Sequence, residues 1–140
     1  MKYWLVKSEP AKYSWSQFVK DDHAVWDGVR NYAARNNLRE MEIGDEVLYY
    51  HSNEGLEIVG IAVVTKTAYQ DPTTEDKNWV VVELKPYKQF PNPVMLTTLK
   101  ADDFFHNMDL IRLSRLSVGK VTQAEYERII EMSGLNYESK

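Results

Sequence analysis

The chain has 140 residues, 44% of them apolar and 27% charged, and this length fits one domain with a sizeable core. It contains no cysteine, which excludes disulfides, thiolate chemistry and sulfur-bound zinc, and no apolar run approaches the roughly eighteen residues of a membrane span. The net charge of −4 argues against coating of long duplex nucleic acid, because such binding needs many phosphate contacts. The charged first residues carry no secretory signal, so we expect a cytoplasmic protein.

The first half of the chain alternates predicted strands with short helices. Residues 3–7 alternate between apolar and polar side chains, which predicts a strand that ends before Pro10. Ser14 begins a capping box, so we expect a short helix that runs to about residue 20. A second helix is predicted over 31–40, with Asn31 as its N-cap, and a strand over 46–51.

The middle of the chain favours strands. Residues 56–69 are rich in β-branched side chains and predict a long, bent strand, and residues 79–86 predict another. Pro91 and Pro93 are expected to frame a loop. A short helix is then predicted to begin at residue 97 or 98 and to end at 105.

The last part of the chain predicts a closing helix. Residues 109–117 are compatible with either a helix or a strand. Thr122 and Glu125 form a second capping box, and Gly134 fits the end of the amphipathic helix that follows. Five or six strands, short helices between them and a closing helix indicate an α+β domain, whose curled sheet is mostly antiparallel or forms a small barrel.

Residues 26–38 are unusually poor in aliphatic side chains. They combine Trp26, a flexible glycine, two arginines and several amide or carboxylate side chains. Indole and guanidinium groups offer flat faces for stacking, and Asn side chains offer donors and acceptors for the edge of a planar ring. The segment therefore predicts a binding site for a flat, polar ligand. Arg30 and Arg35 have the alternative of being solvated or paired with acids.

Catalytic signals are weak. His23, His51 and His106 are isolated and lack metal-ligand spacing, so we expect no metal site. Ser52 follows His51 directly, but adjacent residues of a strand point to opposite faces, so the histidine is badly placed to activate the hydroxyl. The chain has no glycine-rich phosphate loop and no nucleophile elbow.

Binding signals are stronger. Polar residues follow two predicted strands, at 7–10 and 51–52, and strand ends of one sheet converge on a shared mouth. The loop over 26–31 is expected to form a wall of that mouth. Trp26 and one tyrosine would then supply stacking faces, and Glu9 would accept a hydrogen bond from an exocyclic amine. These are the groups that hold an extruded nucleobase. Glu9 has the alternative of serving only as a turn carboxylate.

Several motifs resemble the EVE domain family, which includes the eukaryotic thymocyte nuclear proteins and short bacterial members. The resemblance covers nearly the whole of residues 1–140, read as a single EVE domain of the bacterial kind. It is strongest at two long motifs, residues 3–10 and residues 26–36. Shorter matches lie at residues 50–52, 60–62 and 111–118.

The resemblance implies a PUA-like fold, a bent mixed or antiparallel β-barrel with peripheral short helices and a C-terminal helix. It also implies binding of nucleic acid with modified bases, above all 5-methylcytosine or 5-hydroxymethylcytosine in DNA, with the base flipped into a pocket on the barrel. Carried over by position, the base pocket would comprise Ser8, Glu9, Trp26, Gly28, Val29, Asn31, Tyr50, His51 and Ser52. Lys7, Arg30, Arg112 and Arg115 would contact the sugar and phosphate.

The leading hypothesis is thus a non-catalytic reader of modified bases that needs no cofactor and no membrane. We expect it to be a monomer. One hypothesis is that it works beside a partner enzyme that is encoded separately. Modified RNA is an alternative ligand. One rival is an enzyme that processes a nucleotide or another small molecule with Glu9, His51 and Ser52 in the same pocket. Another is a domain that acts only by docking to a protein.

Overall fold

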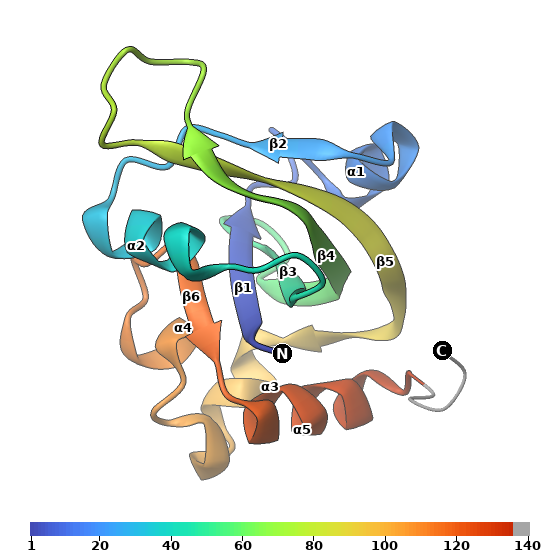
Figure 1. The fold of residues 1–140 in the computed structure, drawn as a ribbon. Helices are drawn as coiled ribbons and strands as arrows, with labels where there is room; N and C mark the ends of the chain where they lie inside the picture. Colours follow the sequence, from blue (N-terminus) through green and yellow to red (C-terminus); the bar gives the residue numbers. More distant parts are fainter. Residues whose placement is uncertain (136–140) are drawn as a thin grey trace.

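The computed structural model describes residues 1–135, which form one curved sheet with helices around it (Figure 1). Within these residues the sheet has six strands in the spatial order β2-β5-β4-β3-β1-β6. The strands are β1 (Tyr3–Ser8), β2 (Ala24–Trp26), β3 (Glu46–His51), β4 (Glu57–Gln70), β5 (Val80–Met95) and β6 (Val118–Val121).

The sheet is mixed, because one of its five strand pairs among the described residues is parallel. β1 runs parallel to β3, while the β1–β6, β2–β5, β3–β4 and β4–β5 pairs are antiparallel. β4 and β5 are long and change register several times, which lets them bend around the core. Over residues 1–135 the edge strands β2 and β6 do not pair with each other, so the sheet is curled but open.

The helices begin where the capping signals predict. Ser14 accepts a hydrogen bond from the Gln17 amide at the start of α1 (Trp15–Asp21). Asn31 caps α2 (Tyr32–Glu40) in the same manner. Thr122 completes a reciprocal capping box at the start of α5 (Gln123–Ser133). The segment between β5 and β6 holds α3 (Leu96–Lys100), a 3-10 turn (Asp103–Phe105) and α4 (Asp109–Arg112).

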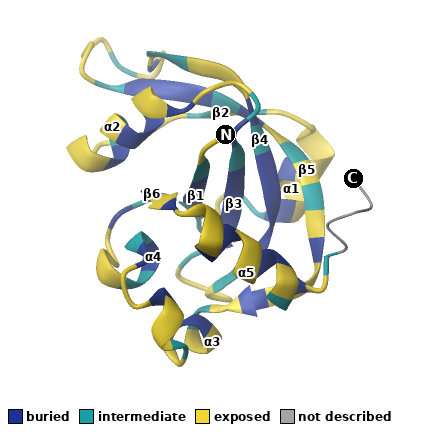
Figure 2. Cartoon of the chain, turned by 60° about the horizontal axis from the view of Figure 1, so that its bottom comes forward, coloured by how far each residue is buried: buried dark blue, intermediate teal, exposed yellow. Residues whose placement is uncertain are grey.

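The core has two parts, one on each face of the sheet. One contains Trp4, Phe18 and Tyr49 and lies beneath α1 and α2. The other contains Leu48, Phe105 and Tyr126 and lies beneath α3 and α5. Figure 2 shows buried positions along β1, β3 and β4, and exposed positions on the outer sides of α2 and α5. Each fully buried apolar side chain contributes about 1.5–3 kcal/mol.

Two parts of the sequence prediction were wrong. The residues around Pro91 and Pro93 belong to β5 and do not form a loop. They lie at a register shift, where the six residues of β5 from Gln89 to Val94 lie opposite only three residues of β4, from Ile58 to Gly60, so the ladder needs no proline N–H there. β2 and β6 were missed because three or four residues are too few to show a strand period. No helix within residues 1–135 has the length and apolar character needed to cross a membrane.

Candidate functional site

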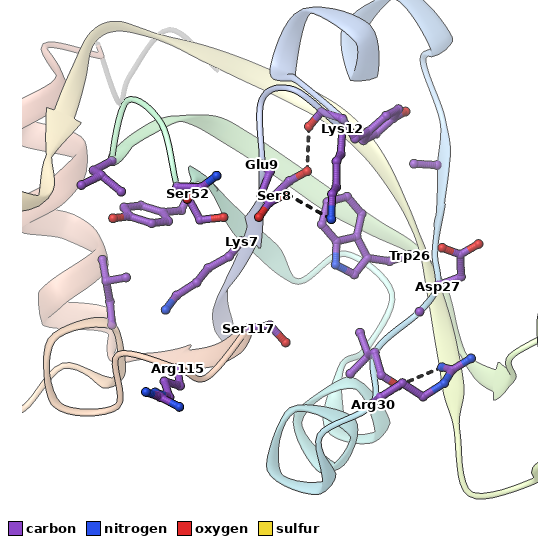
Figure 3. A pocket seen from close by; sticks show the side chains of 18 of the residues that line it. Lys7, Ser8, Glu9, Lys12, Trp26, Asp27, Arg30, Ser52, Arg115 and Ser117 are labelled. Atoms are coloured by element: carbon purple, nitrogen blue, oxygen red, sulfur yellow. Dashed lines mark hydrogen bonds and ion pairs between the residues drawn. The ribbon is translucent and has the colours of Figure 1, made fainter.

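A cavity of about 990 Å³ opens at the end of β1. Its walls come from five places along the chain. They are residues 7–13 at the end of β1 and the turn after it, 21–30 around β2, 50–56 at the end of β3 and the turn after it, 96–100 of α3, and 110–117 from α4 to β6. Figure 3 shows Trp26 and Lys12 on one side of this opening and Arg115 on the other. The volume lies at the upper end of the range for small-molecule sites, so it exceeds the needs of one planar ring.

The parallel pairing of β1 and β3 brings two polar strand ends together. Ser8 is the register partner of His51, so the residues that follow both strands emerge at the same edge of the sheet. The Ser52 amide donates a hydrogen bond to the Ser8 carbonyl at 2.9 Å and ties the two ends to each other. Glu9 and Ser52 therefore line one cavity although forty-three positions separate them in the sequence.

Trp26 stands at the end of β2 with its indole partly buried and part of its surface on the cavity. The ring packs edge-on against Tyr49, with centroids 5.7 Å apart, and against Tyr13, with centroids 6.3 Å apart. These contacts hold the indole in one orientation and leave it accessible from the cavity (Figure 3). A fixed aromatic face suits stacking of a second ring, since little side-chain freedom is lost on binding.

Asp71, at the end of β4, fixes the loop after Trp26. Its buried carboxylate accepts hydrogen bonds from the Gly28 amide at 3.0 Å and from Arg30 Nη1 at 2.9 Å. Thr73 donates two more, from its amide at 2.7 Å and its hydroxyl at 2.6 Å. Burial alone would raise the pKa of Asp71, but these hydrogen bonds lower it well below the ordinary value. Gly28 has a φ of +78°, which favours glycine at this turn.

The polar groups on the cavity are partly engaged with one another. Glu9 is paired with Lys12 at 3.2 Å, but its side chain is 36% exposed and retains free acceptor capacity. The Ser8 hydroxyl donates to the Tyr13 carbonyl at 2.7 Å, and the Tyr13 hydroxyl donates to Asp21 at 3.0 Å. Burial, with the hydrogen bond to Asp21, raises the pKa of Tyr13 and keeps that hydroxyl protonated. Among residues 1–135 no three His, Asp or Glu side chains gather as metal ligands would.

Cationic side chains lie toward the other side of the cavity. Lys7 donates from Nζ to the Ser114 carbonyl at 2.7 Å, and burial lowers the pKa of its amine. Lys100 and Arg115 also line the cavity, together with an apolar surface made of Tyr50, Leu56, Leu96, Leu110 and Ile111. The cavity thus offers an aromatic and carboxylate side for a polar ring, and a basic side for an anionic group.

Ten of the thirteen residues predicted for the site lie on this cavity. Seven belong to the predicted base pocket and three to the predicted phosphate contacts. They are Ser8, Glu9, Trp26, Gly28, Val29, Tyr50 and Ser52, with Lys7, Arg30 and Arg115. Arg30 lines the cavity, but its guanidinium donates hydrogen bonds to Asp71 and Thr73. In this structure it therefore stabilises the loop after β2.

The structure places the other three predicted residues away from the cavity lining. The Asn31 side chain accepts from the Ala34 amide at 3.0 Å as the cap of α2. His51 Nε2 accepts from the Trp15 amide at 3.0 Å, which keeps this nitrogen unprotonated and directs the ring toward α1. Arg112 lies 3.3 Å from Asp109 within α4. An enzyme built on Glu9, His51 and Ser52 would need the histidine in the cavity, and this geometry does not supply it.

Sequence reasoning missed several cavity residues. Lys12 and Tyr13 come from the turn after β1, where backbone hydrogen bonds from both amides to the Glu9 carbonyl fold the chain back. Lys100 is the last residue of α3, and Ser117 lies between α4 and β6. The proline at position 10 signals the turn, but no sequence pattern indicates how far it folds back. For Lys100 and Ser117 no local pattern indicates that these residues pack beside the ends of β1 and β3, because that placement depends on contacts between distant segments.

The sequence pattern that defines the EVE domain matches residues 2–132. The chain belongs to the EVE domain family. Thymocyte nuclear protein 1 from Mus musculus is 33% identical to it over 93% of this chain and 73% of that protein. The human protein of the same name is 31% identical over the same shares.

Solved structures of EVE domains superpose closely on this one. The crystal structure of a protein from Agrobacterium tumefaciens has a TM-score of 0.94 and 43% identity, and the match covers 96% of this chain and 94% of that one. Human THYN1, solved in complex with DNA containing 5-methylcytosine, has a TM-score of 0.88 and 29% identity, over 97% of this chain and 99% of that one. An ASCH protein from Zymomonas mobilis, at 10% identity and a TM-score of 0.54, shares the fold alone. The EVE domain described here is PUA-like in architecture, as the sequence resemblance implies.

Proposed function

We propose that this EVE domain binds nucleic acid and holds one modified base, a modified cytosine in DNA, flipped out of its stack. The observation that carries the proposal is the cavity itself, in which an accessible Trp26 ring and the Glu9 carboxylate face a common space. The proposal is supported by the likeness to human THYN1, whose structure contains 5-methylcytosine DNA. The protein would act as a reader, because binding alone needs no more than these side chains.

The chemistry of the cavity fits cytosine. Cytosine carries an exocyclic amine at N4, and a carboxylate is a natural acceptor for it. Glu9 would take this part, and Trp26 would stack on the ring. The Ser52 hydroxyl lines the same space and would donate to the ring oxygen or nitrogen. The Ser8 hydroxyl donates its proton to the Tyr13 carbonyl, so its oxygen would accept a second hydrogen bond from the amine. A substituent on C5, next to the carbon that carries the amine, would then point into the remainder of the cavity.

The expected affinity is modest. A stacked base contributes about 1–3 kcal/mol, a good edge contact contributes a similar amount, and flipping costs a few kcal/mol. Contacts between phosphates and the basic side chains must supply the rest. Each phosphate contact steepens the dependence of log K on log salt by about 0.7–0.9. Contacts from Lys7, Lys100 and Arg115 would together give a slope of about −2 to −3.

The test is fluorescence anisotropy on short labelled strands that differ in one cytosine, which is unmodified, 5-methylated or 5-hydroxymethylated. Each strand is measured single-stranded and as a duplex, and an RNA version is measured alongside. Trp26→Ala is expected to weaken binding of the preferred strand about 5- to 150-fold. Trp26→Phe should retain most of it. Phe104→Ala, which removes an exposed ring that does not line the cavity, is the matched control.

The results separate the alternatives. A preference for a modified strand that disappears in Trp26→Ala supports the proposal. Glu9→Gln should reduce the preference for cytosine-type bases, since the amide removes the charge and replaces one of the two acceptor oxygens with a donor. Tighter binding of the RNA would assign the pocket to modified RNA. Equal binding of every strand by the wild type, unchanged by Trp26→Ala, would contradict the proposal.

A further inference from the structure

A row of packed aromatic and guanidinium groups extends from the edge of the cavity over the surface shared by α2 and the β4–β5 loop. The Tyr32 and Trp79 rings have centroids 4.9 Å apart at an interplanar angle of 32°. The Arg35 guanidinium lies over the Tyr32 ring at 4.8 Å, and the Arg30 guanidinium lies over the Trp79 ring at 5.7 Å. We call Tyr32, Arg35 and Trp79 the stacking surface.

The stacking surface is held in place by hydrogen bonds. Arg35 donates to the Asn36 side chain at 2.7 and 3.2 Å and to the Asn78 carbonyl at 3.2 Å, which ties α2 to the β4–β5 loop. On the other side, Arg30 is bound to Asp71 and Thr73. The flat groups are therefore ordered before any ligand arrives, and stacking on them costs little further entropy.

Core packing does not account for the stacking surface. Tyr32 is 59% exposed in spite of its two neighbours, and neither it nor Trp79 belongs to either part of the core. In residues 1–135, Arg35 bonds to amide and carbonyl oxygens and to no carboxylate, so its charge is not neutralised by an acid. An exposed aromatic ring beside an unneutralised guanidinium is the arrangement by which proteins bind unpaired bases and their backbone.

The stacking surface lies close to the cavity. Val29 and Arg30 line the cavity, and Tyr32 follows Val29 by only three residues, a span of at most about 11 Å. Successive nucleotides of one strand are about 3.4 Å apart when stacked. A base in the cavity therefore has neighbours on its own strand, one to three nucleotides away, within reach of Tyr32.

We propose that the stacking surface is a second nucleic-acid contact, on which an unpaired base of the same strand stacks while the modified base occupies the cavity. The inference rests on the proposed function and extends it from a single base to a strand. Tyr32 supplies the exposed ring surface that remains beside its two neighbours Trp79 and Arg35, and the Arg35 guanidinium adds charge toward the backbone. The preferred ligand is then single-stranded or locally open nucleic acid.

The test is the dependence of affinity on strand length. Single DNA strands of one, three, five and nine nucleotides, each with one central 5-methylcytosine, are titrated against wild type, Tyr32→Ala, Tyr32→Phe and Phe104→Ala. Wild-type affinity is expected to rise once the strand is long enough to reach Tyr32. Tyr32→Ala should remove this rise, about 5- to 150-fold for the nine-nucleotide strand, and leave the shortest bound strand unaffected. Tyr32→Phe and Phe104→Ala should follow the wild type.

Each other outcome is decisive. If Tyr32→Ala binds every length as the wild type does, the stacking surface makes no contact and the inference is overturned, while a loss in Trp26→Ala keeps the proposed function. An equal loss at every length would show that Tyr32 only shapes the cavity, which also overturns the inference. If no strand binds the wild type, both the inference and the proposed function fall.

Discussion

Replacing Asp71 by Asn tests whether this carboxylate holds the loop that presents Trp26 to the cavity. Asp71 Oδ1 accepts two hydrogen bonds from Thr73, and Oδ2 accepts one each from Gly28 and Arg30. An Asn side chain has one oxygen, so its NH2 group must face one of these two pairs of donors. The NH2 group costs less free energy when it faces Thr73, because the Thr73 hydroxyl can rotate and accept a hydrogen bond from it. The Thr73 amide still loses its partner.

The size of the effect follows from this count. A hydrogen bond to a charged group contributes about 1.5–3 kcal/mol, and one such bond is lost outright while the others lose their charge assistance. The lost attraction to Arg30 adds little, because that side chain is 40% exposed and water screens the pair. We therefore expect Asp71→Asn to lower the free energy of unfolding by about 2–4 kcal/mol at neutral pH.

The assay is urea unfolding of both proteins as a function of pH. The hydrogen bonds lower the pKa of Asp71 in the folded state below its ordinary value of 3.8. The stabilisation is thus fully present above about pH 5 and is lost as the pH falls through 4 toward the folded pKa. The gap between wild type and Asp71→Asn should be constant from neutral pH to about 5 and should shrink below it.

Glu75→Gln, on the same loop and exposed, is the control and should leave the unfolding free energy unchanged within about 0.5 kcal/mol. A change of that small size in Asp71→Asn would refute the assigned role. So would a gap that stays constant from neutral pH down to pH 3. Weaker DNA binding in Asp71→Asn, measured below its unfolding transition, would further link this loop to the cavity.

Three other substitutions test the fold around the site. Asn31→Ala should cost about 0.5–2 kcal/mol in urea unfolding, because the N-cap of α2 is lost, while binding to the shortest strands stays unchanged. Gly60→Ala should cost about 1–3 kcal/mol in thermal unfolding, because its Cβ would lie 2.6 Å from the Trp15 ring. Asn37→Ala should cost about 1–3 kcal/mol, because the buried Val118 carbonyl loses its donor at 2.7 Å, and exchange of amide hydrogens in β6 should become faster.

The sequence predicts the regular elements well where a local signal exists. The capping residues at 14, 31 and 122 mark helix starts that the structure confirms, because a cap is a contact within one turn. The long strand β4 is confirmed for a similar reason, since fourteen residues show a clear pattern. β5 was predicted too short because its prolines are tolerated only through a register shift against β4. That shift depends on the partner strand and cannot be seen in the local sequence.

The candidate site shows the same division. The sequence predicted that the polar strand ends with Glu9 and Ser52 share one mouth, but it did not predict the parallel pairing of β1 and β3 that brings them to the same edge of the sheet. The orientation of His51 could not be predicted, since the Trp15 amide that binds it comes from another element. Asp71 was not singled out at all, although its carboxylate fixes the loop after Trp26. Its role depends on a contact across more than forty positions, which no local pattern carries.

The central claim is that the cavity beside Glu9 and Trp26 receives a single base. A crystal structure of this protein with a short DNA strand that contains one 5-methylcytosine examines it most directly. We predict that the methylated base lies outside its stack, against the Trp26 ring, with its N4 amine within hydrogen-bond distance of Glu9. A methylated base that stays stacked between its neighbours, with the strand bound elsewhere on the surface, would contradict the account.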